Sequence, residues 1–296
     1  MTVSAVGLDV GGSFVKAVRL AADGTVEASE QCPTPTEPQV MIDELAGLAT
    51  KLGSGLPVGV GLAGLVDVDA GILTWGPHLQ GEGVAVGDAL RGRLGVFVSV
   101  DNDANLALLA EVAMGSARGF AQVVMVTLGT GIGLGICLDS EVRRGAGNAG
   151  EAGHMTVDPF GEMCVCGRRG CWETQVSGRR FDEVAASMLG ESSSASDLVA
   201  AALDGHSEAE RYFHEAGCRL ALGIETIVLL LDPEMVVVGG AAAGAGDLLL
   251  DPVRHRLGAT EGAAHRRPAR VAASELGPYA GAIGAAISAR TLVPSP

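Results

Sequence analysis

The chain has 296 residues, 48% of them hydrophobic, and a formal net charge of −15. This length predicts two moderate lobes, and the acidic balance argues against a nucleic-acid-binding surface, which needs a basic face. Apolar runs long enough to cross a bilayer, roughly 18 residues, are absent from the sequence, and the N-terminus has no basic n-region. We therefore expect no membrane span, no signal peptide and a cytoplasmic location.

The first predicted elements form a β-hairpin with glycines in its turn. Residues 6–10 are an apolar strand that ends at Gly11-Gly12, and residues 15–20 form the returning strand. A connector marked by prolines follows, and then a helix over residues 40–52. Residues 58–64 are predicted as a buried strand that runs into a Gly-Leu-Ala-Gly loop.

A similar series of elements begins near residue 123. Before it, residues 96–100 are a predicted strand, and Asp101-Asn102-Asp103 caps a helix over residues 104–114. Residues 123–138 then repeat the pattern of strand, glycine turn and returning strand. This repetition predicts an α/β fold with two related lobes, each opening with a glycine-turned hairpin.

The remaining elements are a helix over residues 208–231, a strand over residues 235–238 that enters Gly239-Gly240, and a helix over residues 279–290 rich in small residues. The long helix is predicted to end before Asp232-Pro233, because the residue that precedes a proline disfavours helical geometry.

The first glycine turn has the pattern D-x-G-G-S, formed by Asp9, Gly11, Gly12 and Ser13. Glycines let backbone N–H groups approach phosphate oxygens, the serine adds a hydroxyl, and the aspartate can hold Mg²⁺ through water. An ordinary hairpin turn with an exposed aspartate is an equally good explanation of this motif alone.

The second glycine turn, with Thr130 and Gly131, allows the same chemistry with the same modest specificity. Two such turns in two lobes are more informative, because together they can hold a polyphosphate from opposite sides. Lys16, one of only two lysines, is either a phosphate contact or a solvated lysine at a strand edge.

Asn102 and Asp103 stand between a strand and a helix. Both residue types favour the N-cap of a helix, which is the structural explanation. A carboxylate at the carboxyl end of a strand in an α/β sheet is also well placed to act as a general base. The two roles are compatible, because Asp101 or Asn102 can cap the helix while Asp103 faces a substrate.

Four potential metal ligands occur in the spacing H-x9-C-x-C-x4-C: His154, Cys164, Cys166 and Cys171. One imidazole and three thiolates suit tetrahedral Zn²⁺, and a site filled by four protein ligands is structural. Three buried thiols beside an unrelated histidine are the alternative, which the glycines of the loop disfavour. We expect an N-terminal lobe over residues 1–116, on which a closing helix at about 278–296 packs, and a C-terminal lobe over residues 117–277 with a zinc-binding loop at 151–173.

Glu151 and Glu173 flank this cluster closely, so a bound zinc would also fix two carboxylates. Exposed glutamates on a solvated surface are the alternative. Carboxylates in pairs are natural acceptors for vicinal hydroxyls of a sugar.

Together these residues resemble the ROK family (repressors, open reading frames and sugar kinases) of the actin-like ATPase superfamily, over nearly the whole chain. The resemblance rests on the segments DVGGS, GLAGLVD, VDNDAN, VTLGTGIGLGI, EAGH, CVCGRRGCWE, VVVGGAAAG and GPYAGAIGAA. It implies a two-lobed actin-like ATPase (ribonuclease H-like) fold with a cleft between the lobes, and an ATP-dependent kinase for glucose or another hexose. The same resemblance implies a cytoplasmic enzyme of carbohydrate metabolism and glycolysis that forms a homodimer or a higher homo-oligomer.

The resemblance also implies a role for each matching position. Asp103 would be the base that accepts the proton of the sugar 6-hydroxyl. The sugar-binding residues would be Gly64, Asn102, Glu151, His154 and Glu173. The residues for ATP, its phosphates and Mg²⁺ would be Asp9, Gly11, Gly12, Ser13, Lys16, Thr130, Gly131, Gly239 and Gly240. His154 would place one ring nitrogen on the structural Zn²⁺ and offer the other to the sugar.

The chain departs from the family pattern in three places. The common Gly-Gly-Thr-Lys turn is GGSFVK here, a Pro-Asn-Leu near the sugar is Pro77-His78-Leu79, and the turn GGAAAG lacks the usual third glycine. His78 therefore leaves the preferred sugar open among glucose, mannose, fructose, N-acetylglucosamine and N-acetylmannosamine.

Three other functions compete with an ATP-dependent sugar kinase. A sugar-sensing repressor would need an N-terminal DNA-binding domain, for which a phosphate strand starting near residue 5 leaves no room. A sugar-binding regulator without kinase activity is disfavoured by the presence of Asp103 and both glycine turns. A polyphosphate-dependent kinase is indicated only by the GGS-x-x-K turn.

Overall fold

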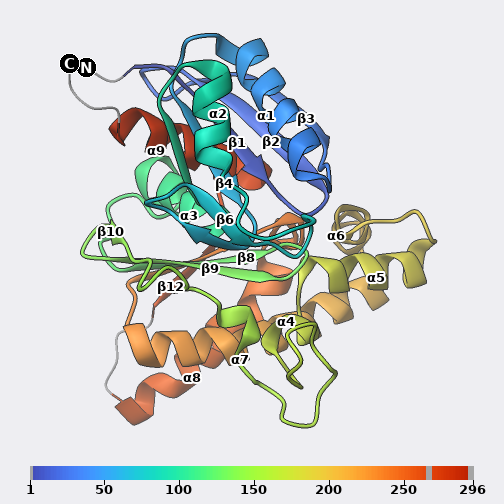
Figure 1. Cartoon of the computed structure of the whole chain (residues 1–296). Helices are drawn as coiled ribbons and strands as arrows, with labels where there is room; N and C mark the ends of the chain where they lie inside the picture. The colour runs from blue at the N-terminus through green and yellow to red at the C-terminus, as the bar shows by residue number, and fades with distance from the viewer. Residues whose placement is uncertain (1–2, 265–268, 293–296) are drawn as a thin grey trace. The chain divides into compact units, whose positions relative to one another are not determined.

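The computed structural model describes residues 3–264 and 269–292, and its described strands form two five-stranded sheets and one two-stranded ribbon (Figure 1). The chain divides into two compact units. Unit 1 comprises Met1–Arg118, Val142–Ala149 and Pro278–Pro296, and unit 2 comprises Gly119–Glu141 and Gly150–Gly277. The predicted α/β fold with two sheets is confirmed.

The sheet of unit 1 has the strand order β3-β2-β1-β4-β7. Its strands are β1 (Ala5–Val10), β2 (Phe14–Leu20), β3 (Val26–Pro33), β4 (Val58–Leu62) and β7 (Val98–Asn102). β1 pairs antiparallel with β2, whereas β1, β4 and β7 are parallel. Val10, Leu62 and Asn102 are register partners, so these three strands end at the same edge.

Four helices cover the two faces of this sheet: α1 (Pro38–Gly53), α2 (Val86–Leu94), α3 (Asp103–Met114) and α9 (Ala280–Leu292) (Figure 1). Val6, Leu8 and Val10 face the apolar core that α1 and α2 complete. Because side chains alternate along a strand, Gly7 points to the opposite face, where a Cβ atom would lie 1.8 Å from the Ala282 carbonyl oxygen of α9. The red helix α9, from the end of the chain, therefore packs directly on the first strand.

The sheet of unit 2 has the order β10-β9-β8-β11-β12. Its strands are β8 (Val123–Leu128), β9 (Ile132–Leu138), β10 (Glu141–Val142), β11 (Met235–Gly239) and β12 (Arg270–Ala273). The helices of this unit are α4 (Trp172–Gln175), α5 (Gly178–Leu189), α6 (Ala195–Leu203), α7 (Ser207–Leu231) and α8 (Asp247–Ala264). Trp172, Phe181 and Phe213 are fully buried in the core, and the rings of Phe181 and Phe213 stack with centroids 5.3 Å apart.

The elements with strong sequence patterns lie where they were predicted, and weakly patterned ones were missed. Both hairpins, the long helix α7 and the final helix are confirmed within a few residues. β3 was missed because it is mostly exposed and ends at Pro33. α2, α8 and the two-stranded ribbon of β5 (Leu65–Asp67) and β6 (Ile72–Trp75) were also not predicted. Among the described helices, none is long and apolar enough to cross a membrane.

The packing of α9 on the sheet is tested by Gly59→Ala in β4. A Cβ atom at Gly59 would lie 1.8 Å from the Ala285 carbonyl oxygen, so helix and sheet must separate. We expect a loss of about 3 kcal/mol in the free energy of unfolding, measured by urea denaturation. Gly47→Ala is the control, because Gly47 lies in α1 with open space around it. A Gly59→Ala protein as stable as the control variant would contradict the packing.

Candidate functional site

The predicted residues of unit 1 gather at the carboxyl edge of its parallel strands. Gly11 follows β1, Gly64 follows β4 by two residues, and Asp103 follows β7 directly. These strands are in register at Val10, Leu62 and Asn102, so the three segments leave the sheet at one edge. Ligands of α/β sheets bind at this kind of edge.

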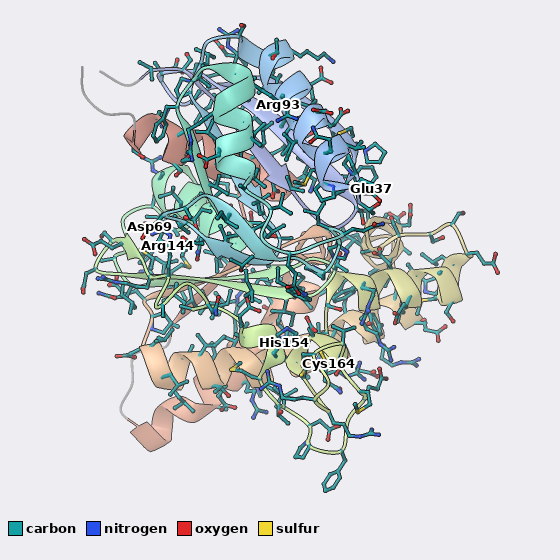
Figure 2. The ribbon with its side chains drawn as sticks, viewed as in Figure 1. Glu37, Asp69, Arg93, Arg144, His154 and Cys164 are labelled. Atoms are coloured by element: carbon teal, nitrogen blue, oxygen red, sulfur yellow. The ribbon has the colours of Figure 1, made fainter. Side chains whose placement is uncertain are left out.

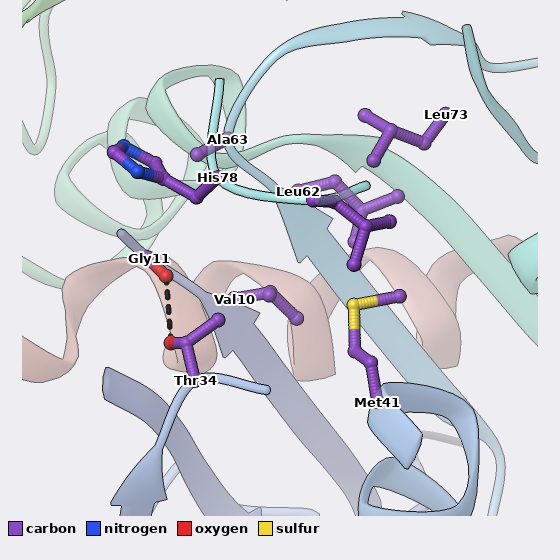
Figure 3. Close-up of a pocket in the computed structure, with 9 residues that line it drawn as sticks. Val10, Gly11, Thr34, Met41, Leu62, Ala63, Leu73 and His78 are labelled. Atoms are coloured by element: carbon purple, nitrogen blue, oxygen red, sulfur yellow. Dashed lines mark hydrogen bonds between the residues drawn. The ribbon is translucent and has the colours of Figure 1, made fainter. Parts of the chain in front are cut away.

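The glycine turn between β1 and β2 is fastened by Thr34. The Gly11 amide donates to the Phe14 carbonyl at 3.1 Å, which closes the turn. Thr34 Oγ1 donates to the Gly11 carbonyl at 2.7 Å (Figure 3), and the Thr34 amide donates to the Ser13 carbonyl at 3.0 Å. Gly12 is partly exposed and Ser13 is exposed, which leaves both accessible to an anion. Sequence analysis missed Thr34 because it stands in a proline-rich connector.

Asp9 and Lys16 are directly opposite each other on β1 and β2. The Asp9 carboxylate packs closely on α9, because a Cβ atom at Gly281 would lie 2.6 Å from Asp9 Oδ2. Burial raises the pKa of Asp9 from 3.8 to about 6, against the opposing charge of Lys16. Asp9 is therefore ionised at neutral pH but held in a poorly solvated place, where a cation would stabilise it further.

Asn102 joins the sugar loop predicted at Gly64 to the start of α3. Its Oδ1 accepts from the amides of Ala104 and Asn105 at 2.9 and 3.2 Å, which makes it the N-cap. Its Nδ2 donates to the Gly64 carbonyl at 3.2 Å. Asp103 is the first residue of the helix, with Oδ1 2.9 Å from the Ala104 amide. The cap and the predicted base are thus separate residues.

His78 lines a small cavity beside the glycine turn (Figure 3). Gly11 and Ala63 line the same cavity, so His78 lies close to both the predicted phosphate turn and the Gly64 loop. The remaining lining is mostly apolar and includes Met41, Leu62 and Leu73. His78 therefore stands beside both of these predicted loops of unit 1.

The two glycine turns of unit 2 also lie at one edge of their sheet. Gly239 is the register partner of Thr127, at the carboxyl ends of the parallel strands β11 and β8. Gly240 has a φ of +98°, and a Cβ atom there would lie 2.2 Å from the Leu128 carbonyl oxygen. Leu128 directly precedes the turn that contains Thr130 and Gly131, so the two turns of unit 2 that are predicted to bind ATP are neighbours.

The predicted metal ligands come together in unit 2. One ligand atom from each of His154, Cys164, Cys166 and Cys171 lies within 4.8 Å of all the others. Cys164 Sγ is 3.6 Å from His154 Nδ1, and the sulfurs of Cys166 and Cys171 are 3.5 Å apart. Four ligands at zinc bond lengths stand about 3.5–3.8 Å from one another. The four groups therefore fit a tetrahedral Zn²⁺, and Figure 2 shows His154 and Cys164 side by side.

The three thiols of the cluster differ in how readily they ionise. The Arg168 amide donates to the Cys166 sulfur and lowers the pKa of that thiol to about 6. Burial raises the pKa of Cys164 and of Cys171. The two buried thiols would become thiolates on binding a metal, which releases their protons, whereas the Cys166 thiol ionises more readily by itself.

Glu151 and Glu173 lie on different sides of the His154 ring. Glu173 Oε1 is 3.4 Å from His154 Nδ1 and 3.0 Å from Cys164 Sγ, whereas Glu151 Oε2 is 3.9 Å from Nε2. A Cβ atom at Gly131 would lie 2.4 Å from Glu173 Oε2. Glu173 therefore connects the metal cluster to the glycine turn. Burial raises the pKa of Glu151, an effect that His154 opposes and Glu173 reinforces.

Burial of Asp9 predicts a pH-dependent stability. Between pH 3.8 and about 6 the folded chain holds a proton that the unfolded chain has lost, so the free energy of unfolding falls as the pH rises through this window. Asp9→Asn removes this cost. We expect the variant to be more stable than the wild type at pH 7.5, by at most about 3 kcal/mol, and to lose this advantage near pH 4.

Urea denaturation at the two pH values measures this difference. Asp23→Asn is the control, because the Thr25 amide lowers the pKa of exposed Asp23 and no gain is expected there. An equal difference between the Asp9→Asn protein and the wild type at both pH values would contradict the burial of this charge.

The metal cluster predicts that Cys166→Ser loses zinc. We expect about one zinc per chain in the wild type by elemental analysis and nearly none in the variant, together with a lower melting temperature. Hexose affinity should fall as well, because His154 and Glu173 lose their fixed positions. Cys218→Ser is the control, since Cys218 is exposed and lies outside the cluster. Loss of zinc with unchanged hexose affinity would limit the metal to a structural role.

Comparisons with known proteins agree with this geometry. The model of the ROK family matches residues 5–291. A glucokinase of Streptomyces coelicolor is 32% identical, over 96% of this chain and 97% of that protein. A putative xylose repressor of Caldicellulosiruptor is 31% identical, over 73% of this chain and 58% of the repressor.

A solved structure gives the same result for the fold. The ROK family glucokinase of Streptomyces griseus, in complex with glucose and AMPPNP, matches with a TM-score of 0.89 and 32% identity, over 97% of this chain and 99% of that one. The family model and the similarity to both glucokinases extend over nearly the entire sequence. The chain belongs to the ROK family.

Proposed function

We propose that this protein is a glucokinase-type enzyme that transfers the γ-phosphoryl group of ATP to the 6-hydroxyl of a hexose, with glucose as the first candidate. The observation that carries the proposal is the shared strand edge of unit 1. It brings a glycine turn suited to phosphate, the Gly64 loop and the Asp103 carboxylate to the ends of three strands in register. The similarity to glucokinases over nearly the full length supports the same activity.

Asp103 acts as the general base in this proposal. Its carboxylate accepts the proton of the sugar 6-hydroxyl as the oxygen attacks the γ-phosphorus of ATP, and ADP leaves from the opposite side. Asn102 caps α3 and donates to Gly64. The Asn102 side chain thus fixes the helix end from which Asp103 reaches the substrate.

Sugar hydroxyls are bound by Gly64 and Asn102 of unit 1 and by Glu151, His154 and Glu173 of unit 2. Glu151 is half-exposed and lies on the Nε2 side of His154, so both can reach a ligand while Nδ1 faces the cysteines. The zinc ion, when bound, supplies structural order to this loop. The residues that would hold it are His154 and the three cysteines.

Phosphate groups of ATP are held by the glycine turns of both units. Backbone amides at Gly12, Ser13, Thr130 and Gly131 would donate to the phosphate oxygens, while Gly11, whose amide closes the turn on the Phe14 carbonyl, would let a phosphate approach the backbone. Asp9 would hold Mg²⁺, which neutralises charge on the phosphates, and Lys16 lies opposite Asp9 on the next strand. The Gly239-Gly240 turn serves the adenosine side.

The sugar is the part of the proposal with open alternatives. Mannose, fructose, N-acetylglucosamine and N-acetylmannosamine remain candidates, because His78 stands where the family frequently has asparagine. A sugar-binding regulator without catalysis is a second function, supported by the similarity to a xylose repressor. We also propose a cytoplasmic homodimer, since ATP is a cytoplasmic substrate and the family resemblance indicates a dimer.

The proposed activity is tested by ADP release with MgATP and each of these five sugars, followed by the same assay on Asp103→Asn. We expect turnover with at least one hexose. The substitution should lower kcat by about 10²–10⁴-fold, because the amide cannot accept a proton. The dissociation constant of the sugar should change little, because the side chain keeps its size.

Asp69→Asn is the matched control, since Asp69 is an exposed aspartate of the same unit (Figure 2). Its kcat should equal that of the wild type. Sugar binding without turnover in the wild type would favour the regulator, and turnover retained in Asp103→Asn would exclude Asp103 as the base.

A further inference from the structure

A short segment returns to unit 1 in the middle of the sequence of unit 2. Residues Val142–Ala149 belong to unit 1, whereas Gly119–Glu141 before them and Gly150–Gly277 after them belong to unit 2. No sequence signal predicted this return. It leads directly to Gly150 and Glu151, the start of the proposed sugar-binding motif. The contacts that hold this segment in unit 1 can therefore influence the position of Glu151.

Arg144 fastens the segment to the carboxyl end of β7. Its Nε and Nη2 donate to Asp101 Oδ2 at 2.9 and 2.5 Å. Asp101 is only 2% exposed, and it also accepts from the Asn102 amide at 2.8 Å and from Asn105 Nδ2 at 3.3 Å. A buried carboxylate with one cationic partner and two neutral donors is well satisfied, and the arginine is the group that balances its charge.

The partners of Asp101 lead directly to the proposed catalytic residues. The backbone amide of Asn102 donates to the Asp101 carboxylate. The Asn102 side chain in turn binds the Gly64 carbonyl and the Ala104 amide. Asn105 lies one turn further along the same helix. The Arg144–Asp101 pair therefore holds Asn102 and Asn105, the residues on either side of Asp103 that donate to Asp101.

The backbone of Arg144 shapes the turn that leads to Glu151. Its carbonyl accepts from the amides of Gly147 and Ala149, at 2.8 and 3.2 Å, and so closes the turn that precedes Gly150. Gly150 has a φ of +103°, and a Cβ atom there would lie 2.1 Å from the Leu134 carbonyl oxygen of β9. The path of the chain into Glu151 is thus closely fixed after Arg144.

We propose that Arg144 is a positioning residue for hexose binding and phosphoryl transfer, which holds the Asn102–Asp103 junction with its side chain and the approach to Glu151 with its backbone. This inference rests on the proposed function. Arg144 need not touch the substrate: it acts through Asp101 and through the turn over residues 144–149. Its loss should therefore affect the sugar more than ATP, whose proposed contacts lie in other turns.

The test compares steady-state kinetics of the wild type, Arg144→Lys and Arg144→Gln. For Arg144→Gln we expect at least a tenfold rise in the KM of the sugar and at least a tenfold fall in kcat, with the KM of ATP within about twofold of the wild type. Arg144→Lys keeps a cation for Asp101 but loses the paired donors, so it should recover part of both losses.

A double variant separates positioning from the cost of a buried charge. Asp101→Asn combined with Arg144→Gln removes both charges, so the melting temperature should rise above that of Arg144→Gln alone. The KM of the sugar should stay high, because the bond between residues 144 and 101 is still missing. Arg91→Gln is the matched control: Arg91 pairs with Asp88 and donates to the Val98 carbonyl at the opposite end of β7.

Two results would overturn the proposal. One is a lower melting temperature in Arg144→Gln with unchanged sugar KM and kcat, as expected for a purely structural pair. The other is recovery of sugar KM in the double variant. Wild-type protein that turns over none of the sugars would refute the proposed kinase instead, and equilibrium binding of glucose to the same variants would then decide the role of Arg144.

Discussion

The close approach of helix α9 to strands β1 and β4 is the constraint on which unit 1 depends. Gly7 and Gly59 remove the side chains that would collide with the carbonyls of Ala282 and Ala285. The same helix covers Asp9 at Gly281, so its packing also sets how strongly the carboxylate is desolvated. A helix from the end of the sequence thereby sets the surroundings of a carboxylate near its beginning.

Unit 2 uses glycine in the same way to bring functional groups together. Because Gly240 has no side chain, the end of β8 can pack against it, and the Glu173 carboxylate packs against Gly131 for the same reason. Glu173 in turn contacts His154 and Cys164 of the metal cluster. The four potential metal ligands, the proposed sugar ligand Glu173 and the proposed phosphate turn are consequently in contact with one another.

The sequence predicted those features that depend on local pattern. Both glycine hairpins, the capped helix at Asn102 and the spacing of the four metal ligands are local, and the structure contains them. Thr34, and the pair of Arg144 with Asp101, were not foreseen. Their roles arise from contacts between residues 23 and 43 positions apart, which no local period or motif records.

The two units supply complementary parts of one proposed reaction. The proposal assigns the base and one phosphate turn to unit 1, and it assigns a second phosphate turn and two sugar-binding carboxylates to unit 2. The most direct measurement is phosphorus NMR of the product formed from glucose and MgATP. We predict glucose 6-phosphate and one ADP for each sugar converted, whereas phosphate on another hydroxyl, or ADP without a phosphorylated sugar, would contradict transfer to the 6-hydroxyl.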